Sequence, residues 1–259
     1  MKSTKVLEKN RKETIKFLCI GVESIGCSAV AYITKKAMRG VNCISIGTDS
    51  KMLKNHDVLQ EVCEGINIVF IIAELGENTV ALAFSNIVKI AKKSGAFTIS
   101  VITKPFRFET EKYLKRESDS VIIIQNGTLA HLTLSDAVIE IIKMVNSKNE
   151  DDVNLGLADL KTTMQNKDIS LVVVGRSMDE AMRHVLSDNT SLHDVTGILI
   201  NFYTNTYFPM ELFNEAMDFM NENAHSDASI ILGSTTDRSL KSKDVKVTMI
   251  LSLALKNQD

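Results

Sequence analysis

Short apolar runs rich in Ile and Val alternate with amphipathic stretches through the first half of this 259-residue chain. The runs lie at 15–22, 42–48, 66–73, 96–103 and 120–126. Such continuous runs are typical of strands buried on both faces of a parallel sheet. Between them, helical periodicity predicts helices at 27–38, 56–63, 79–93 and 109–117. Strand and helix in turn, five times over, predict a doubly wound α/β domain.

The next stretch, 134–147, is apolar from 137 to 145 except at Glu140 and Lys143. A helix with so little polar surface must be covered on most sides, so we expect it to run between two packed layers and join two domains. Beyond it the pattern predicts helices at 157–166, 178–187 and 210–223 and strands at 169–175, 195–204, 229–235 and 244–254. The polar connection between the last two strands predicts that they pair antiparallel.

These patterns divide the chain into four parts. A charged tail occupies 1–14, an α/β domain of the nucleotide-binding type 15–133, a connecting helix 134–152, and a smaller α+β domain 153–259. The sequence has no repeat and no low-complexity linker, so the two domains are predicted to pack against each other.

Composition excludes several classes of protein. The net charge is −2, and the basic residues form no stripe with interleaved aromatics, so we expect no nucleic-acid partner. The four cysteines and five histidines lack the spacing of a metal site, which predicts free thiols in a reducing, cytoplasmic setting. No apolar run reaches the ~18 residues of a membrane span, and the N-terminus lacks the apolar core of a signal peptide.

Three motifs carry a family resemblance: TKPFRFE at 103–109, IGTDSKML at 46–53 and LADLKTTM at 157–164. Together with the order of strands and helices, they resemble FtsZ, the bacterial relative of tubulin, from about Ile15 to Leu255. The resemblance implies the tubulin/FtsZ fold, a Rossmann-like N-terminal domain, a long central helix and a smaller α+β domain. It also implies GTP on the N-terminal loops and hydrolysis triggered by acids on a loop of the neighbouring subunit, here 153–160.

The stretch that corresponds to the tubulin signature departs from it. FtsZ proteins carry GGGTGTG where this chain has GENTVAL at 76–82, so only Gly76 and Thr79 match. Glycines allow positive φ and let backbone N–H groups approach phosphates, and Val80 opposes both. Glu77 adds negative charge, and the asparagine after it can cap the helix itself. We therefore predict a turn that is satisfied from within, not a phosphate site.

The other nucleotide loops agree with this interpretation. An acid and an isoleucine stand in the first turn, and the glycine-rich segment that FtsZ proteins insert after Asp49 is missing. The family positions that this chain keeps are the remaining candidates for nucleotide contact. They are Gly21, Gly26, Gly76 and Thr79 on the phosphate side, Glu109 at the ribose, and Asn126 and Asp136 at the guanine.

The hydrolysis loop is half retained. The family pattern NxDFAD is NLGLAD here, so Asn154 and Asp159 remain while Gly156 replaces the first acid. The loss of a positioned carboxylate slows catalysis by about 10²–10⁴. Asp159 also has a purely structural interpretation, because an acid in the first turn of a helix favours its dipole.

Three functions fit these residues, and we favour the first. In it the protein is an FtsZ-like cell-division or cytoskeletal protein that does not bind or hydrolyse GTP normally and acts as a filament partner, cap or regulator. The alternatives are a divergent GTPase that polymerises itself and a filament or oligomer that needs no nucleotide. No cofactor is expected, except GTP or GDP if the pocket still functions. The expected partner is a conventional FtsZ or a second copy, through head-to-tail contacts.

The sequence ends directly after the last predicted strand, without the flexible tail through which FtsZ proteins meet membrane anchors. Direct membrane binding is therefore not expected.

Overall fold

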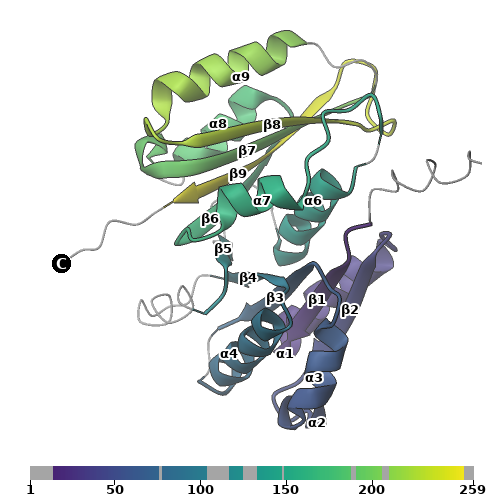
Figure 1. Cartoon of the computed structure of the whole chain (residues 1–259). Helices are drawn as coiled ribbons and strands as arrows, with labels where there is room; N and C mark the ends of the chain where they lie inside the picture. Colours follow the sequence, from purple (N-terminus) through teal and green to yellow (C-terminus); the bar gives the residue numbers. More distant parts are fainter. Residues whose placement is uncertain are drawn as a thin grey trace, which may run out of the picture.

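The computed structural model describes residues 14–75, 78–103, 117–124, 133–147, 149–187, 191–205 and 210–253. Within them the strands form one nine-stranded sheet in the order β2-β1-β3-β4-β5-β6-β9-β7-β8. The first five strands pair in parallel, as the alternating pattern predicts. Figure 1 shows the N-terminal strands and helices below and the C-terminal sheet above.

The predicted N-terminal elements that lie in the described residues are present. The strands are β1 (Phe17–Val22), β2 (Val41–Ile46), β3 (Ile68–Glu74), β4 (Phe97–Thr103) and β5 (Ser120–Ile124), and the helices are α1 (Glu23–Lys35), α2 (Lys51–Lys54), α3 (His56–Cys63) and α4 (Asn78–Lys93). Helix α1 begins four residues before the predicted start, directly after β1. Helix α2 was not predicted, because four residues carry too little periodicity. The helix expected at 109–117 falls almost entirely outside the described residues.

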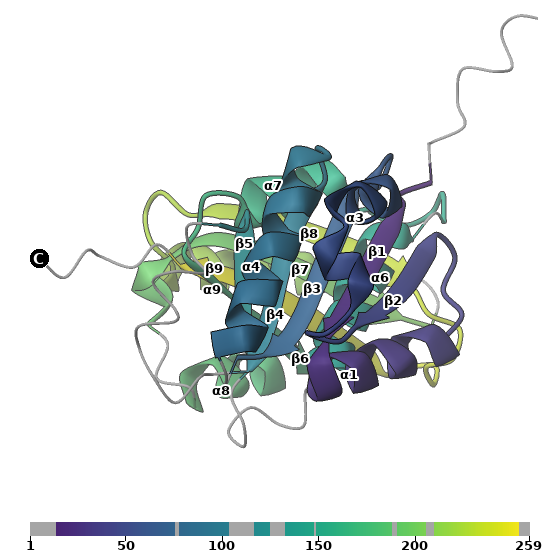
Figure 2. The same cartoon turned by 90° about the horizontal axis from the view of Figure 1, so that it is seen from below.

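Helices cover both faces of the N-terminal strands. Helix α1 packs on one face with the central helix, and α4 packs on the other with α3 beside it (Figures 1 and 2). The stripe of Val80, Phe84, Ile87 and Ala91 on α4 is buried, with at most 6% of any of these residues exposed. The strands are buried on both sides for this reason, which explains their unbroken apolar runs.

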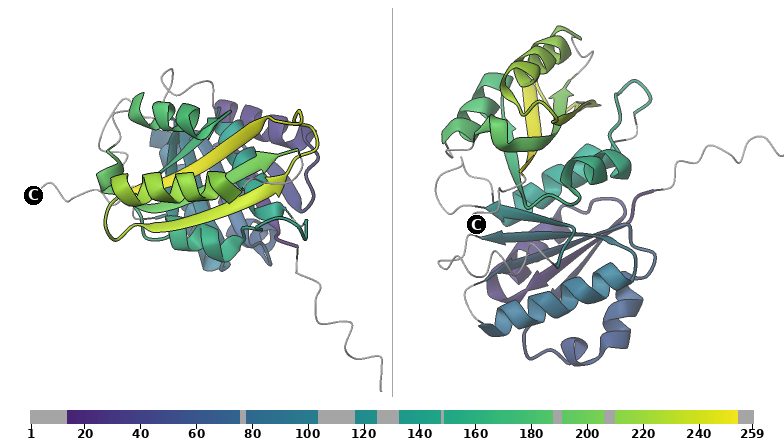
Figure 3. Two further views of the ribbon diagram at one scale, coloured as in Figure 1. Left: turned by 90° about the horizontal axis from the view of Figure 1, so that it is seen from above. Right: turned by 60° about the vertical axis from the view of Figure 1, so that its left-hand side comes forward.

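The C-terminal half follows the predicted elements. They are α7 (Leu157–Met164), β6 (Ile169–Gly175), α8 (Met178–Ser187), the 3-10 helix η1 (Leu192–Asp194), β7 (Val195–Thr204), α9 (Met210–Asn223), β8 (Ser229–Thr236) and β9 (Val245–Leu253). Figure 3 shows these strands from above, with α9 lying across them.

The predicted antiparallel pairing of the last two strands is wrong. Strand β9 lies between β6 and β7 and is antiparallel to both, whereas β8 pairs in parallel with β7 at the edge. Six consecutive residues of β9 are buried, which suits a central strand, whereas β8 is mostly half-buried. A polar connection of this length can join two strands that lie on either side of β7 as readily as it closes a hairpin. The burial of the two strands therefore decides their order in the sheet.

The central helix α6 (Leu134–Asn146) is covered as predicted. Ten of its 13 residues are buried, including Glu140, which is only 7% exposed. Its apolar side chains belong to one core that also takes residues from α1, β3 and, in the C-terminal half, Leu199 and Ile250. Strands β5 and β6 meet at a single residue pair, Ile122 and Ser170. The core around α6 therefore adds a second connection between the two halves of the sheet.

Two glycines let α1 lie close against the strands. A Cβ at residue 21 would lie 2.3 Å from the carbonyl oxygen of Gly26, and one at residue 26 would lie 2.2 Å from the carbonyl oxygen of Ile72. Both neighbours are backbone atoms, so neither contact relaxes without moving the helix.

We predict that Gly26→Ala lowers the free energy of unfolding by about 1–3 kcal/mol, because α1 must shift away from β3. Urea titration followed by circular dichroism measures the change. The matched control is Gly156→Ala, where the added Cβ would have only a carboxylate oxygen of Asp159 within 4 Å, at 3.8 Å. Because Gly156 is the N-cap of α7, where alanine is less favourable than glycine, this control should cost no more than about 1 kcal/mol. Equal effects of the two substitutions would contradict the packing argument.

Candidate functional site

The candidate nucleotide edge lies where β1, β2 and β3 end. These strands are parallel, so the loops that follow their carboxyl ends meet at one edge of the sheet, where open α/β folds bind ligands. The structure describes the β1–α1 turn, the loop after β2 and the end of β3. Three predicted contacts, Gly76, Glu109 and Asn126, lie outside the described residues and stay predictions.

Gly21 and Gly26, the glycines retained in the first turn, have a structural role. Both are buried, and both are required by the close approach of α1 to β1 and β3. Their presence is therefore explained by helix packing alone and does not by itself indicate a phosphate site.

Glu23 lies in the β1–α1 turn of this edge and contacts the loop after β2. It is the first residue of α1 and has a φ of 56°, a left-handed conformation that favours glycine. Its carboxylate accepts the backbone N–H of Thr48, in the loop after β2, at 2.5 Å. The contacts with Thr48 lower the pKa of Glu23, first through the side chain and then through the backbone. The carboxylate thus joins two loops of the nucleotide edge.

More acidic and apolar side chains border the same edge. Asp49 approaches Gly47 in the loop after β2, since a Cβ on that glycine would lie 3.0 Å from a carboxylate oxygen of Asp49. Glu74 is exposed at the end of β3. Leu82 on α4 is 65% exposed and Ile25 on α1 is 41% exposed. In its described part, this edge therefore presents negative charge and apolar surface.

Thr79 and Val80, in the stretch that corresponds to the tubulin signature, lie in different surroundings on helix α4. Thr79, the retained residue, is exposed, whereas Val80 is 6% exposed and belongs to the core between α4 and the strands. The valine therefore anchors the first turn of α4 to the sheet and does not line the edge.

Asp136, the retained guanine-side acid, forms the N-terminal cap of α6. Its carboxylate accepts the backbone N–H of Thr133 at 3.1 Å and the Thr133 hydroxyl at 2.6 Å, and its own N–H donates to that hydroxyl oxygen. This reciprocal capping box is visible in the sequence as Thr-x-x-Asp before an apolar run, a signal that we did not use. A contact between Asp136 and a base remains a prediction.

The two retained residues of the hydrolysis loop are both engaged locally. The Asn154 amide donates to the carbonyl oxygens of Asn149, at 2.7 Å, and Asp152, at 3.1 Å. The Asp159 carboxylate accepts the N–H of Gly156 at 2.8 Å, which caps α7. The observed role of Asp159 is therefore to cap α7, and a role in hydrolysis stays a prediction.

Asp152 fastens this loop to the C-terminal sheet, which the sequence did not reveal. One carboxylate oxygen accepts the N–H of Thr236 at 2.9 Å, and the other accepts its hydroxyl at 2.7 Å. Val153 and Ser234 exchange two further hydrogen bonds beside them, each 3.0 Å long. Asp152 and Val153 are thus hydrogen-bonded along the end of β8.

The outer side of the loop is hollowed. A cavity of about 540 Å³ lies between the loop, the ends of β7 and β8 and the start of α9. Val153 and Met210 line it and are 49% and 54% exposed. This face therefore offers partly exposed apolar side chains around a depression.

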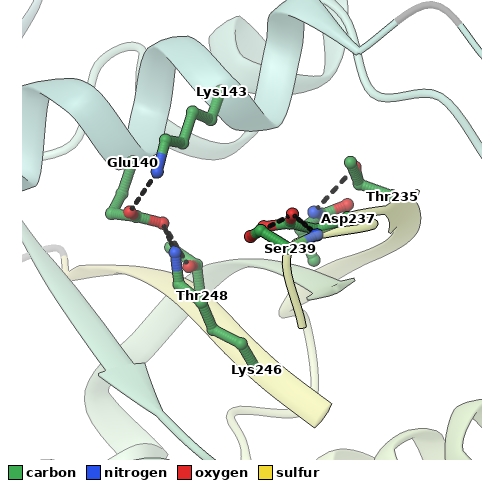
Figure 4. Close-up of polar contacts among 8 residues, drawn as sticks. Glu140, Lys143, Thr235, Asp237, Ser239, Lys246 and Thr248 are labelled. Atoms are coloured by element: carbon green, nitrogen blue, oxygen red, sulfur yellow. Dashed lines mark hydrogen bonds and ion pairs between the residues drawn. The ribbon is translucent and has the colours of Figure 1, made fainter. Parts of the chain in front are cut away.

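A polar cluster connects α6 to the strands of the C-terminal half (Figure 4). The buried Glu140 carboxylate pairs with Lys246 of β9, accepts the hydroxyl of Thr248 at 3.1 Å, and lies 3.5 Å from the ammonium of Lys143. Lys246 also lies over the ring of Tyr203, 4.7 Å from its centroid. Burial and then the charge of Glu140 raise the pKa of Tyr203 above its usual range, so its hydroxyl stays neutral.

The described residues contain no group of three His, Cys, Asp or Glu side chains that could hold a metal ion. Among the helices that the structure describes, none combines the length and the apolar character needed to cross a bilayer.

Comparison with known proteins gives a consistent result. Residues 173–253 match the model of the FtsZ family, C-terminal domain. The cell division protein FtsZ of Neisseria meningitidis serogroup A is 27% identical over 299 residues, which cover 89% of this chain and 76% of that protein. The FtsZ of Helicobacter pylori strain J99 is 26% identical over 287 residues, covering 97% and 71%.

Solved structures agree on the fold. An FtsZ mutant from M. jannaschii superposes with a TM-score of 0.76 and 19% identity, over 93% of this chain and 92% of that one. An empty FtsZ dimer from M. jannaschii gives a TM-score of 0.73 and 20% identity, over 93% and 89%. The predicted tubulin/FtsZ-like architecture is confirmed.

The buried ion pair of the polar cluster generates a prediction. Lys246→Met leaves the Glu140 carboxylate without its nearest cation, and we expect the free energy of unfolding to fall by about 2–4 kcal/mol. The double variant Glu140→Leu/Lys246→Met removes both charges and should recover most of that loss. Urea unfolding of the single and double variants provides the measurement.

The control for this prediction is Lys241→Met, since that lysine is exposed in the connection between β8 and β9, shortly before Lys246. It should change stability by less than about 0.5 kcal/mol. If Lys246→Met were no more destabilising than Lys241→Met, the ion pair would not hold α6 in place.

Proposed function

Because this chain belongs to the FtsZ superfamily, we propose that it is an FtsZ-like cell-division protein that joins conventional FtsZ filaments without the usual cycle of GTP binding and hydrolysis. It acts there as a filament partner, cap or regulator. Contact is made head to tail, through the face that carries the hydrolysis loop.

The contact between Glu23 and Thr48 carries this proposal. The carboxylate occupies a backbone N–H of the nucleotide edge and brings negative charge to the turn where the family has glycines. A triphosphate placed there meets like charge from Glu23 and Asp49, and the Thr48 donor is already used. Normal GTP binding is disfavoured by both effects.

The opposite face supports the choice of contact surface. The hydrolysis loop keeps Asn154 and Asp159, and the contacts of Asp152 with Thr236 hold it on the sheet. Gly156 replaces one acid, so a subunit docked there lacks one of the two carboxylates that the family resemblance implies. This asymmetry suits a protein that terminates or modifies a filament instead of extending it by hydrolysis.

The first test is nucleotide binding by the intact protein. Calorimetry with GTP or GDP at millimolar concentration, with and without Mg²⁺, should give no binding heat, and thermal shift should agree. Micromolar binding would overturn the proposed loss of the site.

Co-sedimentation is the next measurement. The protein should co-sediment with a conventional FtsZ whose assembly requires GTP, and should not sediment alone. Sedimentation alone would instead support a self-assembling GTPase if it needs GTP, or a nucleotide-free oligomer if it does not.

The second test locates the contact face with two matched surface substitutions. Val153→Glu places a charge beside the cavity at the hydrolysis loop, and we expect it to weaken co-sedimentation at least about tenfold, equivalent to ~1.4 kcal/mol. Leu82→Glu makes the same change on the nucleotide edge and should have little effect. A larger effect of Leu82→Glu would place the contact on the nucleotide edge.

A further inference from the structure

Cys19 and Cys43 form a neighbouring pair in the N-terminal sheet. They are register partners on the parallel strands β1 and β2, and β2 is the edge strand of the sheet that the structure describes. Neighbouring strands lie about 4.8 Å apart, within the ~4.4–6.8 Å between Cα atoms that a disulfide spans. Cys19 is fully buried, whereas Cys43 is half-buried. The pair thus has one protected thiol and one that small molecules in solution reach.

The two thiols differ in protonation. A hydrogen bond with Cys19 lowers the pKa of Cys43 to about 6, against the opposing effect of burial. The same hydrogen bond and then burial raise the pKa of Cys19. Cys19 therefore holds its proton more tightly than Cys43, and the thiolate form is favoured at Cys43. The thiolate is the nucleophilic form of cysteine, so Cys43 is the reactive member.

We propose that Cys43 is an oxidation site for hydrogen peroxide and that it forms a reversible disulfide with Cys19, which ties the edge strand to β1. The inference is independent of the proposed function.

The chemistry proceeds in two balanced steps. The Cys43 thiolate attacks one peroxide oxygen, and the O–O bond breaks. Hydroxide is the leaving group, and Cys43 becomes a sulfenic acid. The Cys19 sulfur then attacks the Cys43 sulfur, and the sulfenic hydroxyl leaves with the Cys19 proton as water. The two sulfurs together lose two electrons, which the peroxide gains. A thiol reductant reverses the reaction by exchange.

The disulfide would act on the nucleotide edge. Strand β1 leads directly to Glu23, and β2 leads to the loop that contains Thr48. A bond between Cys19 and Cys43 fixes the spacing of the two strands shortly before these residues. Oxidation therefore restricts relative movement of the two strands that lead to the Glu23–Thr48 contact.

The chain supplies its own controls. Cys63 is fully buried, and burial raises its pKa to about 11, so it should remain unreactive at neutral pH. Cys27 donates its thiol to the carbonyl oxygen of Gly21, with 3.5 Å between sulfur and oxygen. Reaction at Cys63 or Cys27 at the rate of Cys43 would contradict the assignment.

The test begins with labelling of the reduced, full-length protein. Iodoacetamide at pH 7 should modify Cys43 at least about tenfold faster than Cys63, as measured by peptide mass spectrometry. The rate at Cys43 should fall about tenfold between pH 7 and pH 5, because the thiolate fraction falls below a pKa of about 6. An unchanged rate over this range would remove the basis for peroxide reactivity.

Stoichiometric hydrogen peroxide should then give a disulfide between the tryptic peptides 17–35 and 40–51, and dithiothreitol should remove it. Fragmentation of the linked peptides must place the bond on Cys19 and not on Cys27. Cys19→Ala should stop the reaction at a sulfenic acid that dimedone traps on Cys43, and Cys43→Ser should abolish the linked peptides. A Cys27 linkage, a bond between two molecules, or no linkage in the parent protein would overturn the proposal.

Discussion

The burial of α6 on nearly all sides is the constraint on which the rest of the molecule depends. Strands β5 and β6 share one residue pair, so the two halves of the sheet have little direct hydrogen bonding across their junction. The common core around α6 and the ion pair of Glu140 with Lys246 supply the missing connection. A charged group buried in an apolar helix is tolerated only with a partner, so the pair also fixes which face of α6 meets β9.

The same helix explains how the two ends of the molecule can change independently. Its first turn is closed by its own capping box at Asp136, and its last turn leads into a loop that Asp152 anchors on β8. Neither arrangement requires a nucleotide. The β1–α1 turn and the hydrolysis loop are therefore held by separate contacts, and this separation makes a filament partner with an altered nucleotide edge physically reasonable.

The sequence predicted most elements because their periodicity reflects burial. Runs covered on both faces read as strands, and the stripe on α4 reads as a helix. The order of β8 and β9 was missed, since strand pairing depends on contacts between distant residues. Asp152 was missed for the same reason, as its partner Thr236 lies far along the chain. The acid at Glu23 was visible, but its left-handed backbone and its contact with Thr48 arise only when two loops meet in the folded protein.

The conformation of Glu23 bears on how the candidate nucleotide edge is held together. A residue other than glycine in the left-handed region costs roughly 1 kcal/mol, and such a cost persists only where surrounding contacts enforce it. Here the carboxylate offsets the cost by joining Thr48 to the start of α1. Glu23 therefore acts as an internal anion that holds the β1–α1 turn to the loop after β2.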